Sequence, residues 1–457
     1  MQRRYLTYAA AIASVLVLTY CSNGDVNTIP DPTVTLPTAA TMQVPGITSS
    51  VTYSFDLGAV DPATNTYYVT DRTNKSIDVV NLTTLKVTGQ FKQAFAGCNS
   101  TTGTTTATPI ALPGCNTLQG TWTVNNDASG PDGLDVVGNT LFVGDVNKLM
   151  VLNKTTGALI ATIAIASTPT GLRADEGCFD PVNHLYAIST PGDDNPFMTI
   201  LDTTATEATG AAPTVKARLI MDNPAGTASG GLEACVFDTG VGGTGKLFVN
   251  NDGNNAVPGS TASRGEMDGI PVTSLTPLTG GGNVQYTTLA GVSQYALPDV
   301  VGVTGQCDPT GIALGPGTEI GAMCRTGTIG RSLNFLVLNK TTGAVAATVV
   351  GAGGGDQITY DATSKRWFLA NSRHTANGSS CGAGTATCPL FPALTVVADD
   401  GIAAPTLVHH ITNGNNAHSV AVHPGLGLVV TPFSAPTANG GGAAFANGGI
   451  NVFRTTQ

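Results

Sequence analysis

Charged side chains are scarce in this sequence of 457 residues. Asp, Glu, Lys and Arg make up 11% of it, less than half of the share of about 25% found in typical soluble domains. Only 20 residues are Lys or Arg against 30 Asp or Glu, so the formal net charge is −10 at pH 7. A phosphate backbone would meet net repulsion instead of the counterion release that drives nucleic-acid binding. Nucleic acids and anionic lipid surfaces are therefore not expected partners.

Several familiar chemical signatures are missing as well. The sequence has no CxxC pair for zinc or redox work, no CxxCH for haem attachment and no GxSxG elbow of a serine hydrolase. It has no helical periodicity either. Glycine, in contrast, is abundant at 57 residues, and it occurs together with 41% hydrophobic residues. This combination indicates a folded, turn-rich protein and excludes a disordered polar chain.

The N-terminus reads as a processing signal followed by a tether. Arg3 and Arg4 precede an apolar run from Ala9 to Leu18, which is too short to span a bilayer. The tetrad ending at Cys21 (LTYC) resembles a bacterial lipobox, and the resemblance implies that this cysteine is lipidated. We expect residues 1–21 to be an export signal and residues 22–45 to be a Thr/Pro-rich tether.

The cysteine count agrees with export. If Cys21 bears lipid, the other eight of the nine cysteines can pair completely, as expected in an oxidising compartment. Eight cysteines allow 105 connectivities, and position along the chain favours four pairs: Cys98–Cys115, Cys178–Cys235, Cys307–Cys324 and Cys381–Cys388. We therefore predict a periplasmic or outer-surface protein that contacts the membrane only through an anchor at Cys21.

An internal repeat is the strongest signal. The octapeptide VLNKTTGA occurs at Val151–Ala158 and again at Val337–Ala344. Around both copies runs a cycle of about 40 to 60 residues with four short strands separated by polar turns. The first strand of this cycle recurs at seven places: Phe55–Asp61, Asp132–Val137, Asp175–Asp180, Glu233–Asp238, Thr310–Gly315, Asp356–Asp361 and His418–His423.

Four short strands per cycle, rich in β-branched and aromatic residues, are typical of the blades of a β-propeller. We predict an all-β, seven-bladed propeller of four-stranded antiparallel blades in one domain, residues 46–457, with six or eight blades as alternatives. The last cycle has only three strands before the chain stops. We expect an N-terminal strand at Met42–Ile47 to supply the fourth and close the ring.

Two segments of the first cycle also point to a family. Tyr68–Asp71 (YVTD), followed by Ser76–Thr84 (SIDVVNLTT), resembles the YVTN-type repeat of YncE-like seven-bladed propellers from bacterial and archaeal envelopes. The resemblance implies the propeller fold and a binding role at the envelope. Relatives by fold include lactonases and lyases, so the fold does not decide the activity.

Alignment of the seven first strands predicts a ring of polar residues at the channel mouth. In a propeller, the segment that leads into each innermost strand and the loop between the second and third strands open on the same face. The leading positions hold mostly acids: Asp56, Asp132, Asp175, Glu233, Thr310, Asp356 and His418. The neighbouring loops add further charged residues, among them Arg72, Arg325, Arg373 and His374.

Two interpretations of this ring remain open. Clustered carboxylates favour a cation or a small polar ligand. Oxygen ligands would suit calcium or another divalent ion, with possible ligands Asp132, Asp175, Glu233, Asp356 and His418. The alternative is structural, because Asp often caps turns through backbone amides.

The function that we expect is a cell-envelope binding or scaffold module whose partner is an unknown envelope protein or a small polar ligand. The expected ligand-binding residues are Asp56, Asp132, Asp175, Glu233, Asp356, His418, Arg72, Arg325 and Arg373. The alternative is a metal-dependent, lactonase- or lyase-like enzyme, with His418, Asp356 and His374 as candidate catalytic residues. A structural surface protein is a third possibility.

Overall fold

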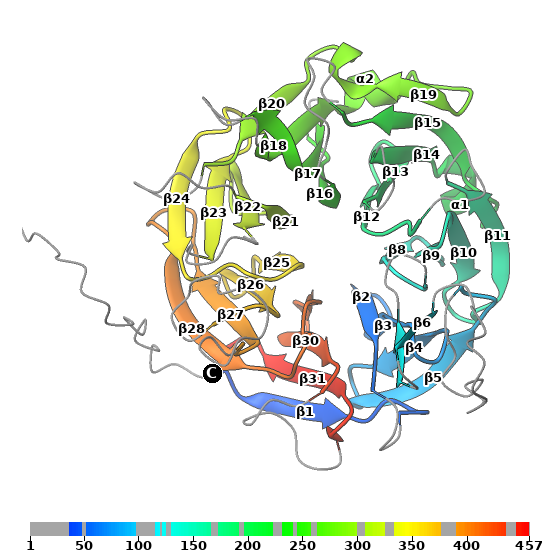
Figure 1. Ribbon diagram of the computed structural model, residues 1–457, viewed down its shortest axis with the longest axis vertical. Helices are drawn as coiled ribbons and strands as arrows, with labels where there is room; N and C mark the ends of the chain where they lie inside the picture. Colours follow the sequence, from blue (N-terminus) through cyan, green and yellow to red (C-terminus); the bar gives the residue numbers. More distant parts are fainter. Residues whose placement is uncertain are drawn as a thin grey trace, which may run out of the picture.

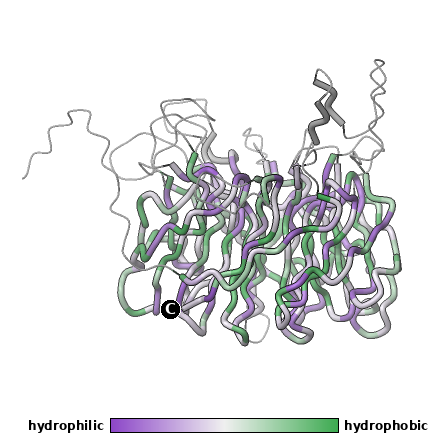
Figure 2. The backbone as a smooth tube through the Cα atoms, turned by 90° about the horizontal axis from the view of Figure 1, so that it is seen from below, coloured by the Kyte–Doolittle hydropathy of each residue, from purple (hydrophilic) through white to green (hydrophobic). Residues whose placement is uncertain are grey.

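The blades are arranged around a central channel (Figure 1). The computed structural model describes residues 36–47, 52–96, 115–118, 121–124, 129–165, 172–191, 196–222, 231–240, 245–256, 263–298, 307–324, 333–375, 390–435 and 445–456. Within these ranges the chain forms seven four-stranded antiparallel blades. This confirms the predicted seven-bladed β-propeller. Seen from the side, the ring is a short cylinder, and hydrophobic segments recur along its whole width (Figure 2).

Each blade runs from an innermost to an outermost strand, and we number the blades in chain order. Blades one to three consist of β2 (Phe55–Asp61), β3 (Thr66–Asp71), β4 (Ser76–Asn81) and β5 (Lys86–Lys92); β8 (Leu134–Val137), β9 (Thr140–Asp145), β10 (Lys148–Asn153) and β11 (Leu159–Ala164); and β12 (Gly177–Asp180), β13 (Leu185–Thr190), β14 (Phe197–Asp202) and β15 (Thr214–Ile220).

The remaining blades follow the same order. Blades four to seven consist of β16 (Leu232–Asp238), β17 (Lys246–Ala256), β18 (Ser263–Pro271) and β20 (Ser293–Ala296); β21 (Pro309–Leu314), β22 (Glu319–Cys324), β23 (Asn334–Asn339) and β24 (Val345–Val350); β25 (Ile358–Asp361), β26 (Arg366–Asn371), β27 (Ala393–Ala398) and β28 (Thr406–Thr412); and β29 (Ala421–His423), β30 (Leu428–Phe433), β31 (Gly449–Arg454) and β1 (Thr38–Met42).

Burial along the strands explains their sequence pattern. The second strands β9, β13 and β30 are buried at every position, because each blade is packed between two neighbours and both of its faces are covered. Such strands read as continuous apolar runs. The outermost strand β5 instead alternates between exposed and half-buried residues, as expected for a strand with one face toward solvent.

The hydrophobic core is divided among the blade interfaces. Seven clusters of buried apolar side chains are present in the described residues, one between each pair of neighbouring blades. Blades five and six meet through Phe335 and Trp367, whose rings lie 5.1 Å apart in an edge-on arrangement. Each blade therefore depends on both neighbours for its burial, including the first blade on the last.

The ring is closed by β1, which pairs with β31 so that Thr38 lies opposite Phe453 and Met42 opposite Ile450. Closure by an N-terminal strand is thus confirmed, but its predicted position, Met42–Ile47, was wrong: the strand ends at Met42. It also lies before residue 46, where we expected the propeller domain to begin. Val44 and Ile47, which favoured the later segment, are instead buried in the cluster between blades seven and one.

The repeated octapeptide covers the end of the third strand and the following turn in blades two and five. The side-chain oxygen of Asn153 accepts hydrogen bonds from the backbone amides of the next two threonines, and Asn339 does the same in the second copy. The lysine of each copy, Lys154 and Lys340, forms an ion pair with the last Asp of the innermost strand in the preceding blade, at 2.8 and 2.9 Å. The repeat therefore records contacts between blades as well as a turn.

A few elements lie outside the regular blades. β19 (Gly282–Gln285) lies between the third and fourth strands of blade four, and it pairs in parallel with β15, adding a strand to the outer edge of blade three. β6 (Cys115–Leu118) and β7 (Thr121–Val124) form a separate antiparallel pair. Short helices occur at α1 (Thr204–Thr209), α2 (Val272–Leu275) and the 3₁₀ turn η3 (Tyr286–Thr288). No helix among the described residues has the length and hydropathy needed to cross a membrane.

Two of the predicted disulfides are present. Cys178–Cys235 joins the innermost strands of blades three and four, and Cys307–Cys324 joins the segment before β21 to the end of β22. The other two predicted pairs involve Cys98, Cys381 and Cys388, which lie outside the described residues. The two disulfides indicate an oxidising compartment, in agreement with export.

Removal of the closing strand tests the dependence of each blade on its neighbours. A chain that starts at Gln43 lacks β1, so it loses the buried side chains of Leu36 and Met42 and leaves the edge of β31 unpaired. We expect it to lose several kcal/mol of stability, since loss of one such buried side chain alone costs about 2–5 kcal/mol. We also expect it to self-associate. Thermal unfolding and size-exclusion chromatography, with a chain that starts at Leu36 as the control, measure both effects; equal melting temperatures would contradict the prediction.

Candidate functional site

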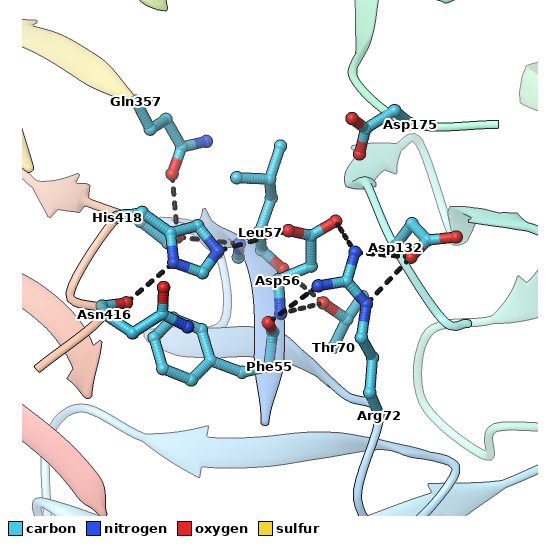
Figure 3. Close-up of polar contacts among 12 residues, drawn as sticks. Phe55, Asp56, Leu57, Thr70, Arg72, Asp132, Asp175, Gln357, Asn416 and His418 are labelled. Carbon is cyan, nitrogen blue, oxygen red and sulfur yellow. Dashed lines mark hydrogen bonds and ion pairs between the residues drawn. The ribbon is translucent and has the colours of Figure 1, made fainter. Parts of the chain in front are cut away.

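Carboxylates from two blades converge at the channel mouth on one buried arginine. Arg72 follows β3, and its side chain is only 2% exposed. Its guanidinium donates to Asp56 of blade one at 2.7 Å and to Asp132, just before β8 of blade two, at 2.6 and 2.9 Å (Figure 3). A further hydrogen bond reaches the carbonyl oxygen of Phe55 at 3.1 Å. Arg72 thus joins the first two blades at their inner ends.

These contacts set the protonation of the two acids. Burial raises the pKa of Asp56, but Arg72 and His418 outweigh this effect and hold it well below its usual range. Burial raises the pKa of Asp132 well above its usual value, and the negative charge of Asp56 raises it further. Arg72 lowers the pKa of Asp132, but this effect is smaller than that of burial. Asp56 is therefore the ionised partner of the arginine. The second carboxylate oxygen of Asp132 is buried without a hydrogen-bond partner.

His418 completes the connection to blade seven. Its Nδ1 lies 2.7 Å from the carbonyl oxygen of Asn416, and its Nε2 lies 3.2 Å from Asp56 Oδ1 (Figure 3). Both partners are acceptors, so the imidazole donates at both nitrogens and is protonated. Burial lowers the pKa of His418, but the hydrogen bond to Asp56 and the nearby acids outweigh it and raise the pKa above its ordinary value. The ring also stacks on Phe55, with centroids 4.7 Å apart.

Two further residues, Arg173 and Glu176, were not predicted. Arg173 forms an ion pair with Asp175 at 3.1 Å, and it also lies close enough to Asp56, Asp132 and Glu233 for those acids to raise its pKa. Burial raises the pKa of Asp175 to about 7, although Arg173 opposes the rise. A dense run of charge in a charge-poor sequence, RADE at residues 173–176, is the signal that would have found both.

The structural interpretation of the leading acids is wrong for Asp56 and Asp132, whose carboxylates pair with Arg72 instead of capping turns. Turn capping occurs at the opposite end of the innermost strands. Asp61, Asp180 and Asp361 each accept hydrogen bonds from backbone amides two or three residues later. The aspartates at the two ends of these innermost strands thus have different roles: Asp56 and Asp132 form ion pairs at the mouth, and Asp61, Asp180 and Asp361 hold the hairpins on the far face.

Other predicted residues lie apart from this network. His374 stacks on His410 of the outermost strand β28, with ring centroids 4.1 Å apart, and so does not approach His418. Arg373 is exposed, and Arg325 lies outside the described residues. The hydroxyl of Thr310 donates a hydrogen bond to the backbone carbonyl oxygen of Gly355. Asp356 is half-buried. It lies close enough to His418 for its charge to raise the pKa of the histidine.

The predicted divalent-cation site does not fit these residues. In the ranges that the structure describes, no group of three His, Cys, Asp or Glu side chains is arranged to hold a metal ion. The physical reason is that Asp56 and Asp132 form ion pairs with Arg72, and Asp175 forms one with Arg173. The guanidinium groups supply the positive charge that a metal would have supplied.

Inside the mouth lies a cavity of about 320 Å³. Its walls come from the innermost strands of blades one to six and include the apolar side chains of Leu57, Leu134 and Ile312. The polar groups that line it include the carboxyls of Asp135 and Glu176 and the amide of Gln357, and the Cys178–Cys235 disulfide also forms part of the wall. Asp135 accepts a hydrogen bond from Tyr186 at 2.8 Å, but burial dominates and raises its pKa to about 7. A volume near 300 Å³ is the lower end of the range for small-molecule sites.

Comparison with known proteins supports the fold and goes no further. No protein-family model matches the chain, and no curated protein sequence matches it. The structure is similar to that of the RRP9 WD40 repeats, with 9% identity over 92% of this chain and 99% of that chain and a TM-score of 0.55. It is also similar to U3-55K, with 8% identity over 89% and 97% of the chains and a TM-score of 0.53. A hydrazine synthase of Kuenenia stuttgartiensis matches with 13% identity over 86% and 96%, at a TM-score of 0.51.

Replacement of the buried arginine tests the network at the mouth. Arg72→Met leaves Asp56 and Asp132 buried without their cation, and removal of one partner from a buried ion pair costs about 3–5 kcal/mol. We expect a loss of that size in the free energy of unfolding, measured by chemical denaturation. Arg373→Met, at an exposed arginine of the same face, is the matched control and is expected to change stability by less than about 0.5 kcal/mol. Equal effects of the two substitutions would contradict the assigned role of Arg72.

The raised pKa of Asp135 predicts a pH-dependent stability. Its pKa is about 7 in the folded chain and about 3.9 in an unfolded one, so the folded state binds more protons between these values. The contribution of Asp135 is greatest below about pH 4 and is lost as the pH rises to about 7. We expect Asp135→Asn to reduce the fall in the free energy of unfolding between pH 4 and 7. Parallel pH profiles of the variant and the wild type would refute this, and Asp400→Asn, at an exposed turn, provides the control.

Proposed function

We infer that this protein is a binding or scaffold propeller of the YVTN/YncE-like type at the cell envelope. In this proposal the face around the channel mouth presents a site for a small polar ligand or a partner protein. The observation that supports it most is the buried ion network formed by Arg72, Asp56, Asp132 and His418. A protein that needed only a stable ring would gain as much from apolar side chains at these positions, because buried ion pairs are costly to desolvate.

The rigidity of the same face agrees with a binding role. Cys307–Cys324 connects the segment before β21 with the end of β22, both of which lie on the mouth side of blade five. Cys178–Cys235 fixes two neighbouring innermost strands in the channel wall. A surface that is held in one conformation before it binds loses less conformational entropy on binding. The face is therefore suited to recognition without a moving lid.

The location at the envelope belongs to the same proposal. Disulfides between blades and within a blade are typical of an oxidising compartment, and the lipobox-like tetrad at Cys21 would add a lipid anchor. This part of the proposal requires that the mature chain be recovered outside the cytoplasm with both disulfides formed. Recovery of the reduced chain from the cytoplasm would reject it.

No specific contact favours the enzymatic alternative. Both ring nitrogens of His418 are engaged by acceptors, so the ring is not available as a general base in this arrangement. His374, the other histidine proposed for catalysis, is paired with His410 in the outer part of blade six. A lactonase- or lyase-like reaction would also need a metal ligand set that the described residues do not provide.

Two exposed cations on opposite faces test the binding face. Arg373 follows β26 on the mouth side, and Lys365 lies in the hairpin between β25 and β26 on the far side. We expect Arg373→Glu to lower the amount of envelope protein or polar metabolite retained by the immobilised, disulfide-intact chain by about tenfold, as reversal of a rim charge weakens recognition. Lys365→Glu should retain the wild-type amount. Equal retention by both variants, or a larger loss with Lys365→Glu, would reject the mouth as the binding face.

A further inference from the structure

One carboxyl group at the channel mouth has no counter-ion. Glu176 directly precedes β12 and is 6% exposed, and its side chain lines the central cavity. Its carboxylate makes no hydrogen bond or ion pair with any residue that the structure describes. The nearby cations are already engaged, Arg72 with Asp56 and Asp132, and Arg173 with Asp175.

Several charged groups act on Glu176 from the surrounding blades. Burial raises its pKa well above the usual value, and the neighbouring acids add to this: Asp175, Glu233, Asp356 and Asp56. The opposing bases at the mouth are Arg72, Arg173 and His418, while Asp132 shares Arg72 with Asp56. Acids therefore outnumber bases around Glu176, and burial together with these acids favours the protonated form of its carboxyl.

The cavity below Glu176 has the size and lining of a site for a small organic molecule. Its volume of about 320 Å³ equals that of about ten waters at roughly 30 Å³ each, far more than a bare ion needs. Leu57, Leu134, Phe179 and Ile312 supply apolar surface. The innermost strands have no neighbouring strand on the channel side, so their backbone carbonyl groups on that edge are suitable acceptors for a donor in the channel.

We propose that the central cavity binds a small organic cation, a primary ammonium group on a short apolar body, with Glu176 as its counter-ion. An ammonium group has three N–H donors, which suits one carboxylate together with backbone carbonyl oxygens. A quaternary ammonium would lack these donors and could not form hydrogen bonds to the carboxylate or to the backbone carbonyl oxygens. A metal ion is disfavoured by the ligand geometry described above.

This inference deepens the proposed function and rests on it in one respect, the use of the mouth as the binding face. Binding of the ammonium group to ionised Glu176 displaces the proton that the free carboxyl holds. The affinity should therefore increase with pH up to the pKa of Glu176, while the amine itself stays protonated. This proton release distinguishes the proposed site from simple partition of an apolar molecule into the channel.

The test uses n-butylamine as the probe and n-butanol as its neutral analogue, with the full disulfide-intact chain in isothermal titration calorimetry. We expect the amine to bind at least about tenfold more tightly than the alcohol, because a charge-assisted hydrogen bond replaces a neutral one. We also expect proton release, detected in buffers of different ionisation enthalpy. Glu176→Gln should remove the preference and the proton release, while Asp400→Asn, at an exposed carboxylate, should retain both.

Equal affinity for amine and alcohol in the wild type would overturn the inference, and so would an unchanged preference in Glu176→Gln. Because the preference for the amine and the proton release are both measured on the wild type, the test remains decisive even if the variant fails to fold. Binding of Ca²⁺ instead of the amine would also reject it. If n-butylamine does not bind but Arg373→Glu still lowers the retention of envelope protein or polar metabolite, only the proposed class of ligand is wrong. If Arg373→Glu has no effect on retention either, the proposed binding face is wrong as well.

Discussion

The constraint on which the rest of the structure depends is closure of the ring. A blade of a propeller has two apolar faces and cannot bury either of them alone. In this chain, each hydrophobic cluster lies between two blades, and the cluster between blades seven and one includes Met42 of β1, which pairs with β31. The seven blade interfaces therefore form one continuous ring of contacts. The channel, its mouth and its cavity are geometric results of that closure.

Closure also explains why so much charge is buried at the mouth. The inner ends of all blades meet there, so residues at equivalent positions come close together whatever their type. Acids at those positions would repel one another in a region with little water. Arg72 between blades one and two, and Arg173 beside Asp175, offset this repulsion. Glu176, next to Asp175, makes no ion pair with the residues that the structure describes, and its side chain lines the cavity; for these reasons we assign the counter-ion of the ligand to it.

The regular parts of the fold could be predicted because they repeat. The innermost strands, the Asn-capped turns of the octapeptide and the four-strand order all follow from local patterns that appear several times along the chain. The closing strand could not be located correctly, since β1 consists of small and polar residues (TAATM) and is anchored mainly by Leu36 and Met42 at its margins. The segment from Met42 to Ile47 is more apolar and so looked more like a strand.

The candidate site was predictable in outline only. Periodicity identified which residues lead into the innermost strands, and Asp56, Asp132 and His418 do meet. Periodicity does not tell how far a side chain reaches. Arg72 crosses from one blade to the next, whereas His374 turns outward to His410, and both follow a second strand. Such differences depend on side-chain direction in loops of unequal length, which have no counterpart elsewhere in the repeat.

The register of the closing pair has a mechanical consequence. Thr38 lies opposite Phe453 and Met42 lies opposite Ile450, so the N-terminal end of β1 and the C-terminal end of β31 are adjacent. A force applied between these two ends would separate the strands like a zipper and break their hydrogen bonds one after another at low load. A chain held only from the N-terminal side would not be loaded in this way, because no opposing force would act on β31. The ring is therefore better suited to attachment at one end than to a position within a chain under tension.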